Sequence, residues 1–251
     1  MYSDVFLAPD WPQSMVEIDS VARASSLPEE EIEHLWTIYD FLAKLFSGRY
    51  RGSGRPFVNH LTGTAGLLIM HSGNPAEIRA GFAHAAYTQG EFGKIKAGAS
   101  ASNREAVRSV IGEEAEALVF HYQDFDWLRI LDRYSKGESL PISNVEKSLL
   151  FVRLANELDD SMDCGVYDIR WCQRCLHRLE LGAKVAESIG RASLASQARS
   201  RIQKIHENEL LGKANYRKKQ SITVLNPGLK QVRTLKLGRK IRRLVSTLLN
   251  P

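Results

Sequence analysis

Residues 51–70, "RGSGRPFVNHLTGTAGLLIM", indicate the fold more clearly than any other stretch of the chain. The first half contains two glycines and Pro56, which are typical of a loop, and the second half is almost wholly apolar. We therefore expect a loop that ends at His60 and an apolar helix over residues 61–70. A second histidine, His84, follows in "GFAHAAYTQGEF". Two histidines beside a buried helix raise the question of a metal site.

Outside this stretch, apolar residues recur at helical spacing along most of the chain. Ser26 and Pro28, followed by three glutamates, predict the start of a helix over residues 30–46, which Gly48 ends. Alternating, strand-like patterns are nearly absent, and only residues 221–225 show one. The sequence therefore predicts an all-α fold. Further helices are expected at residues 76–87, 103–122, 144–162, 168–189 and 192–211.

These patterns divide the chain into three parts. Residues 1–27 contain two prolines and no clear periodicity, so they predict an extended N-terminal arm. Residues 28–212 hold the helical patterns and predict one all-α domain. Residues 213–251 form a basic C-terminal tail. We find no internal repeat.

Composition limits the class of protein. Hydrophobic residues make up 43% of the 251 residues, which is enough for a sizeable core. Three cysteines imply no disulfide framework and favour a reducing compartment. No apolar run approaches the roughly 20 residues of a spanning helix. The first residues carry Asp4 and Asp10 without a basic segment, so we expect no secretory signal. The sequence therefore predicts a cytoplasmic protein, with peripheral association with a membrane as the alternative.

The charges are distributed very unevenly. No acidic residue follows Glu209, and the tail beyond it holds eleven lysines and arginines. Subtracting these from 34 leaves 23 basic residues against 29 acidic ones in the preceding part. A helix in the tail would align Leu237, Ile241, Leu244 and Leu248 on one stripe flanked by basic residues.

We therefore expect residues 227–251 to contact an anionic membrane surface or a protein partner, a solvated extension being the alternative. No aromatic residue follows Tyr216, so base stacking is unsupported and nucleic acid is not an expected partner. The oligomeric state is not predicted.

Four segments resemble, in the same order, parts of the HD domain of alarmone (ppGpp) hydrolases. They are the Arg-x-Ser-Gly-x-Pro-Phe-x-x-His pattern at 51–60, "AGFAHAAY" at 80–87, "IGEEAEALV" at 111–119 and "FVRLANELDD" at 151–160. The resemblance covers about residues 30–190 and implies an HD-like helical bundle. In that family two histidines and two aspartates hold a divalent metal, which activates a water molecule for phosphoester hydrolysis.

The resemblance assigns His60 and His84 to the two metal-binding histidines. Ala85 stands at the position of the first aspartate and Asn156 at that of the last. An acidic pair that the family places after the His-Asp motif is replaced by Thr88 and Gln89. Because Mg²⁺ and Mn²⁺ prefer oxygen ligands, we expect no metal cofactor and no alarmone hydrolysis.

Other side chains could rebuild the site. Asp160 lies four residues after Asn156, on the same helical face. Together His60, His84, His121 and Asp160 would suit a single divalent metal, Zn, Fe or Mn.

Two readings without a metal stay open. One is acid–base chemistry by a histidine whose pKa is tuned by Glu91 or Asp160. The other is a pair of buried, hydrogen-bonded histidines that remain from a lost site. Arg51 matches the arginine that the family uses against the nucleotide base, and Arg49 and Arg55 flank it. An anionic ligand near this loop is therefore expected.

Two functions follow as hypotheses. The first is a divergent HD-domain enzyme acting on a phosphorylated or otherwise anionic small molecule. Its catalytic residues would be His60, His84, Glu91 and Asp160, and its ligand-binding residues Arg51, His121 and Asn156. The second is a catalytically inactive HD-like module that binds a ligand or serves as a scaffold, docking on a membrane or protein partner through its tail. Convergence of these side chains on one point favours a working site.

The cysteines suggest a zinc cluster at first sight. Cys172 and Cys175, however, lie within a helical pattern, whereas structural zinc sites use tight turns. At helical spacing these two cysteines share a face and His177 points elsewhere. We therefore expect Cys164, Cys172 and Cys175 to be small buried thiols.

Overall fold

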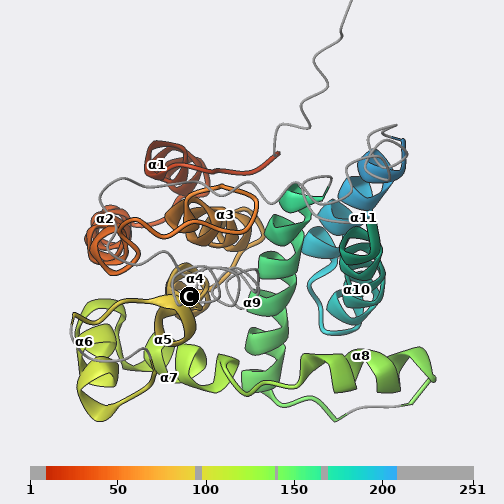
Figure 1. Cartoon of the computed structure of the whole chain (residues 1–251). Coiled ribbons are helices and arrows are strands. Elements are labelled where there is room, and N and C mark those ends of the chain that lie inside the picture. The colour runs from red at the N-terminus through yellow and green to blue at the C-terminus, as the bar shows by residue number, and fades with distance from the viewer. Residues whose placement is uncertain (1–9, 94–97, 139–140, 165–168, 208–251) are drawn as a thin grey trace, which may run out of the picture. The chain divides into compact units, whose positions relative to one another are not determined.

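The computed structural model describes residues 10–93, 98–138, 141–164 and 169–207 (Figure 1). Within these ranges all regular structure is helical, apart from an isolated bridge between Tyr50 and Pro56. The predicted all-α fold is therefore confirmed for the body, whereas the predicted tail and the possible strand at 221–225 lie outside the described residues. The elements are α1 (Met15–Ala24), α2 (Glu29–Leu45), α3 (Phe57–Met70), α4 (Pro75–Ala83), α5 (Ala86–Gln89), α6 (Ala101–Ile111), α7 (Glu113–Tyr122), α8 (Trp127–Ser135), α9 (Asn144–Asp160), the 3-10 helix η1 (Ser161–Asp163), α10 (Ile169–Ser188) and α11 (Ala192–Glu207).

The N-terminal segment is not an extended arm in its described part, so that prediction is wrong there. Ser14 caps α1 and forms a reciprocal capping box with Glu17. Met15 and Ile18 bury the inner face of this helix, and Trp11 is buried just before it. The apolar pattern of α1 spans only ten residues and follows two prolines, so the sequence alone did not predict a helix there. The arm thus becomes part of the core and brings Trp11 toward α9.

Several helix boundaries differ from the sequence-based expectation. α3 begins at Phe57, so His60 lies within the helix and not at the end of a loop. Pro28, rather than Ser26, stands at the N-cap of α2. The expected helix over 76–87 is broken at His84 and Ala85 into α4 and α5. The expected helix over 103–122 is broken at Gly112, whose φ of 87° is accessible to glycine at little cost. α8 was not predicted, because its amphipathic pattern spans only nine residues.

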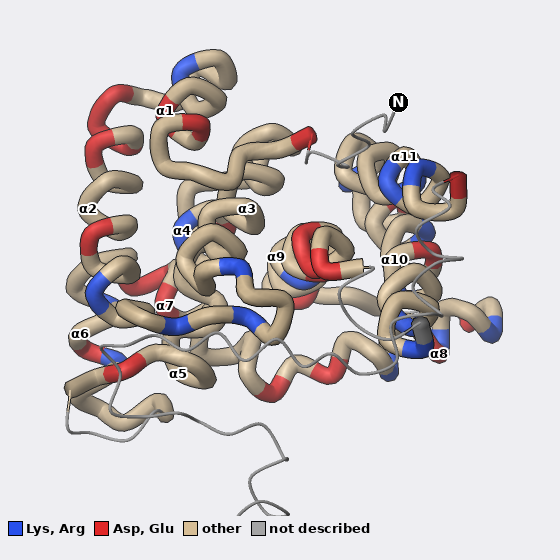
Figure 2. Tube along the Cα trace, turned by 45° about the horizontal axis from the view of Figure 1, so that its top comes forward, with Lys and Arg blue, Asp and Glu red and all other residues tan. Residues whose placement is uncertain are grey.

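α9 runs through the centre of the described bundle (Figure 1). It packs against α3 and α4 on one side and against α10 on the other, and α11 packs along α10. Apolar residues of α9 are buried on several faces, as expected of a central helix. Its final turn nevertheless carries acidic residues, which Figure 2 shows in red. Charged side chains are thus brought into the protein interior.

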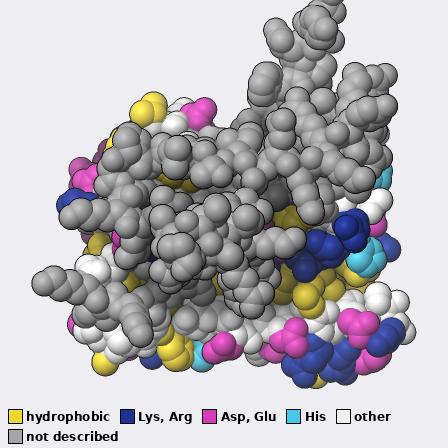
Figure 3. All heavy atoms as spheres, in the orientation of Figure 1, with side chains coloured by type: hydrophobic (Ala, Val, Ile, Leu, Met, Phe, Trp, Pro, Cys, Tyr) yellow, Lys and Arg dark blue, Asp and Glu magenta, His cyan; other side chains and the backbone are white. Residues whose placement is uncertain are grey.

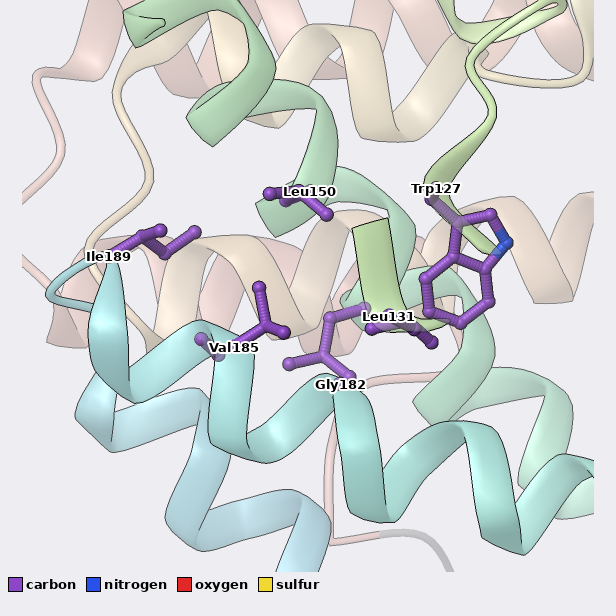
Figure 4. A pocket seen from close by; sticks show the side chains of 8 residues that line it. Trp127, Leu131, Leu150, Gly182, Val185 and Ile189 are labelled. Atoms are coloured by element: carbon purple, nitrogen blue, oxygen red, sulfur yellow. The ribbon is translucent and has the colours of Figure 1, made fainter. Parts of the chain in front are cut away.

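A smaller hydrophobic cluster joins α8 to α9 and α10. Charged side chains of both signs cover the outer surface of α8 (Figure 3), while its inner face packs on Leu150 and Val185. Between these helices lies a cavity of about 10 Å³, lined by the side chains in Figure 4. This volume is about that of one water-sized probe, so the cavity is no ligand pocket. None of the described helices is long and apolar enough to cross a membrane.

Candidate functional site

His60 meets the end of α9 in the interior of the bundle. Its Nδ1 lies 2.6 Å from Oδ2 of Asp159, and its Nε2 lies 3.1 Å from Oδ1 of Asn156. The exposed fractions of the two residues in the closer pair are 1% for His60 and 0% for Asp159. The expected proximity of His60 and Asn156 is therefore present, and a carboxylate that we had not singled out completes the contact.

Four polar side chains contact the carboxylate of Asp159. Trp11 Nε1 and Gln13 Nε2 each donate to its Oδ1 at 3.0 Å, and Arg55 pairs with its Oδ2. Burial opposes the charged form, but the charges and hydrogen bonds of Arg55 and His60 outweigh burial and hold the pKa of Asp159 well below its usual range. Asp159 is therefore a buried anion with several charge-assisted hydrogen bonds.

The backbone of α3 is shaped to admit this carboxylate. A Cβ atom at Gly63 would clash with Asp159 Oδ1 and would lie 2.6 Å from Gln13 Nε2. Gly63 therefore allows α3 and α9 to approach closely at the level of His60. The sequence held a signal for Asp159, because it lies three residues after Asn156 and so shares its helical face.

Arg51 lies beside the same cluster, but it does not face open solvent. Its Nη2 lies 2.5 Å from Oδ1 of Asp160, and its Nε lies 2.7 Å from Oδ2 of Asp163. Asp160 Oδ1 is 3.6 Å from His60 Nδ1. Asp159 and Asp160, which lie near His60, and Asp163 are thus paired with two arginines, Arg51 and Arg55. We call these six residues the arginine–carboxylate cluster: Arg51, Arg55, His60, Asp159, Asp160 and Asp163.

His84 lies next to the cluster as a neutral imidazole. Its ring centroid is 5.1 Å from that of His60, and its Nδ1 donates to the carbonyl of Gly81 at 2.7 Å. Burial, with the neighbouring His60, lowers the pKa of His84 to about 3. The proton therefore stays on Nδ1, and the lone pair is on Nε2. Among the described residues, His84 Nε2 has no hydrogen-bond partner.

Tyr122, rather than His121, borders this pair of histidines. The ring centroids of Tyr122 and His84 are 5.4 Å apart, whereas His121 is exposed and packs on Phe120. Adjacent helical residues point about 100° apart, so only one of the two can face inward. The predicted placement of His121 in the site is therefore wrong. Arg153 donates to the Tyr122 hydroxyl at 3.2 Å, and burial raises the pKa of Tyr122 to about 12.

Glu91 is likewise not in the cluster. It is exposed and pairs with Arg49 at 2.6 Å, so its predicted catalytic contact with a histidine does not form. The proposed metal set of His60, His84, His121 and Asp160 is not assembled, since His121 faces away. In the described part of the chain, no group of three or more His, Cys, Asp or Glu side chains is arranged to hold a metal ion.

The cysteines lie elsewhere, at the junction of η1 and α10. Cys172 and Cys175 are buried and His177 is exposed, as predicted, whereas Cys164 is half-buried.

One comparison with known proteins gives a match. A family model described as a domain of unknown function, DUF6817, matches residues 41–126. This segment includes His60, His84 and the arginine-rich loop. It ends before α9, which supplies Asn156, Asp159 and Asp160 to the site. No curated protein matches the chain.

Proposed function

We propose that the chain is a catalytically inactive, HD-like helical module that docks on an anionic membrane surface through its basic tail. The proposal that the module is inactive is carried by the pairing of Arg51 and Arg55 with Asp159, Asp160 and Asp163, two of which lie near His60. The HD-like half is supported by the meeting of His60, His84 and Asn156, which the resemblance had aligned with metal ligands.

The donor set of the cluster fits a divalent metal poorly. Asp159 is fully buried and already accepts from Trp11, Gln13, Arg55 and His60. A metal would have to displace at least one guanidinium, which would leave a charge uncompensated in a low-dielectric environment at a cost of several kcal/mol. The arginines thus supply the positive charge that a metal supplies in a hydrolase. The cluster then serves to hold α3, α9 and the loop around residue 51 together.

Docking is assigned to the tail because it holds the excess charge. Eleven basic and no acidic residues follow Glu209, while the preceding part carries an acidic excess. Each lysine or arginine near an anionic membrane contributes about 1 kcal/mol. The stripe of Leu237, Ile241 and Leu244 would add apolar contact with the lipid.

Co-sedimentation with vesicles tests this docking. Full-length protein should sediment with phosphatidylserine-containing vesicles and stay in solution with pure phosphatidylcholine. Binding should fall steeply as salt is raised, because exposed charges are screened beyond about 8 Å at physiological ionic strength. Deleting residues 227–251 should abolish binding while the helical circular dichroism of the body persists. A matched variant, Leu237→Ser with Ile241→Ser, keeps every charge. It should lose only the part of the vesicle binding that comes from apolar contact with the lipid.

If full-length and truncated proteins sediment equally little, the membrane is not the partner. Cross-linking of the tail to a second protein would then favour a scaffold that binds a protein partner. Salt-sensitive binding to DNA or RNA without lipid binding would contradict the membrane proposal.

A metal-free enzyme acting on an anionic small molecule is the second candidate, because one observation favours it. The 2.6 Å contact between His60 Nδ1 and Asp159 orients the imidazole as in acid–base dyads, and His84 Nε2 lies nearby with its lone pair. Hydrolysis of a phosphomonoester or phosphodiester that His60→Gln abolishes, without unfolding the protein, would favour this candidate. No turnover in chelator-treated protein would leave the inactive module as the better proposal.

A further inference from the structure

The first half of α10 carries an exposed row of basic side chains. Arg170 and Arg174 are exposed and lie one turn apart, and the exposed His177 extends the row by a further turn. Arg178 borders the row and is half-buried, with its Nη1 3.8 Å from Oε2 of Glu157. No aspartate or glutamate occurs in residues 169–179. Among the described residues, no carboxylate pairs with Arg170 or Arg174.

α2 carries an exposed row of the opposite charge. Glu30, Glu33 and Asp40 are exposed and share one face of the helix. No lysine or arginine of the described residues forms an ion pair with any of these three carboxylates. Trp36, which is 38% exposed, lies in the middle of the row. Lys44, one turn beyond Asp40, is the only lysine or arginine of α2.

The two rows match in length as well as in sign. At a rise of about 1.5 Å per residue, the acidic row extends about 15 Å from Glu30 to Asp40, and the basic row about 10 Å from Arg170 to His177. Two such helices laid side by side can form charge-assisted hydrogen bonds between arginine and carboxylate, and can place a guanidinium on Trp36. Tryptophan and arginine are also the side chains most enriched at the centres of protein interfaces.

One molecule cannot bring its own two rows together. α2 and α10 lie on opposite sides of the described bundle (Figures 1 and 2), and they are joined through α4 and α9. The complement of each row must therefore come from another molecule, and a second copy of the chain always carries it.

We propose that the basic row of α10 in one copy docks on the acidic row of α2 in another copy. Because the two rows are different surfaces, each pair keeps one free row at either end, and the contact adds further copies in a head-to-tail manner. The contact is independent of the proposed membrane docking, because both rows belong to the described body of the chain and not to the tail.

Sedimentation velocity of the full-length protein tests the contact. Because each exposed ion pair contributes little, the association is weak and requires concentrated protein. The mean sedimentation coefficient should increase with protein concentration at an ionic strength of about 0.01 M. It should increase far less at about 0.15 M, where charges more than about 8 Å apart are screened. A coefficient that does not change with concentration at the low ionic strength would overturn the proposal.

Two double variants each remove one row. Arg170→Gln with Arg174→Gln removes the cations of α10, and Glu33→Gln with Asp40→Asn removes carboxylates of α2. All four side chains are exposed, so both variants should keep the helical circular dichroism of the unsubstituted protein. Either variant alone should associate about tenfold more weakly.

A matched control separates the basic row from net charge. Arg129→Gln with Lys147→Gln also removes two cations that pair with no carboxylate of the described residues, but these lie on α8 and α9. This control should associate like the unsubstituted protein. If it associates as weakly as the variant of Arg170 and Arg174, net charge rather than the basic row drives association, and the proposal is wrong.

Mixing the two double variants gives the sharpest result. One variant keeps the acidic row and the other keeps the basic row, so a single contact can form between them and cannot extend. We expect one-to-one pairs in the mixture, and no larger species, at concentrations where either variant alone is monomeric. A mixture without pairs would refute the proposal. Unweakened association of the variant of Arg170 and Arg174 would also refute it, because the acidic row would then bind another basic part of the chain.

Discussion

The substitution Asp159→Asn removes one charge from the interior with almost no change in shape. The asparagine oxygen can still accept from Trp11 and Gln13, but its amide group then faces the donors of Arg55 and His60. Breaking a buried ion pair by removing one partner costs about 3–5 kcal/mol. This is a large share of the roughly 5–15 kcal/mol that is usual for a folded domain. It lowers the folding equilibrium constant by a factor of about 150 to 5,000.

Urea unfolding at pH 7, followed by circular dichroism at 222 nm, measures this loss in the full-length protein. The matched control is Asp132→Asn, which removes a carboxylate that pairs with Lys136 on the exposed face of α8. Exposed ion pairs contribute little, so the control should unfold almost like the unsubstituted protein. A loss below about 1 kcal/mol for Asp159→Asn, or equal effects of the two substitutions, would refute the idea that the buried charges hold the cluster together.

The pH dependence gives a second check on the same residue. Because the folded state lowers the pKa of Asp159, its stabilisation is fully present above the pKa of the unfolded chain, near 3.8, and is lost as pH falls further. The difference between the unsubstituted protein and Asp159→Asn should therefore be constant from pH 7 to about pH 5 and narrow below pH 4. A stability difference between the two proteins that grows as the pH falls would contradict this prediction.

Three further predictions concern the same region. Gly63→Ala should destabilise the protein because the new methyl group meets the Asp159 carboxylate, and in urea unfolding its effect should not add to that of Asp159→Asn. The folded state lowers the pKa of His84 to about 3, so the contribution of the neutral ring to folding stability is complete above about pH 6.5 and declines toward pH 3. Nuclear magnetic resonance should find the His84 ring neutral, with the proton on Nδ1, from pH 5 to 8. An imidazolium at pH 6 would contradict this prediction. Incubation with ppGpp and Mn²⁺ should release no pyrophosphate, because Ala85 and Asn156 stand at the aligned aspartate positions.

Helical periodicity was sufficient to predict the body of the fold, since long amphipathic segments such as those of α2 and α10 bury a continuous stripe. Periodicity did not predict features that depend on one residue or on a short segment. Gly112 ends one helix and begins another because it adopts a positive φ, and an apolar pattern alone does not reveal that conformation. α1 was missed because its pattern is only ten residues long and follows two prolines. Short helices take their stability from tertiary packing, which a single sequence does not display.

The candidate site was predicted in part. His60, His84 and Asn156 come together, as the aligned motifs implied, and Arg51 and Asp160 lie beside them. The pairing between Arg51 and its carboxylates was not foreseen, because an ion-pair partner more than 100 residues away leaves no local pattern. Whether His121 or Tyr122 faces inward depends on the exact start of α7, and a shift of one residue turns a side chain by about 100°.

Elemental analysis of the purified protein, combined with calorimetric titration of Mn²⁺ and Zn²⁺, tests most directly whether arginines have taken the place of a metal. We predict no stoichiometric metal in the protein as isolated and no saturable heat of binding, because Arg51 and Arg55 occupy the carboxylates around His60. One tightly bound ion per chain, lost on His60→Gln or His84→Gln, would contradict the inactive, arginine-balanced cluster and restore a metal-dependent site.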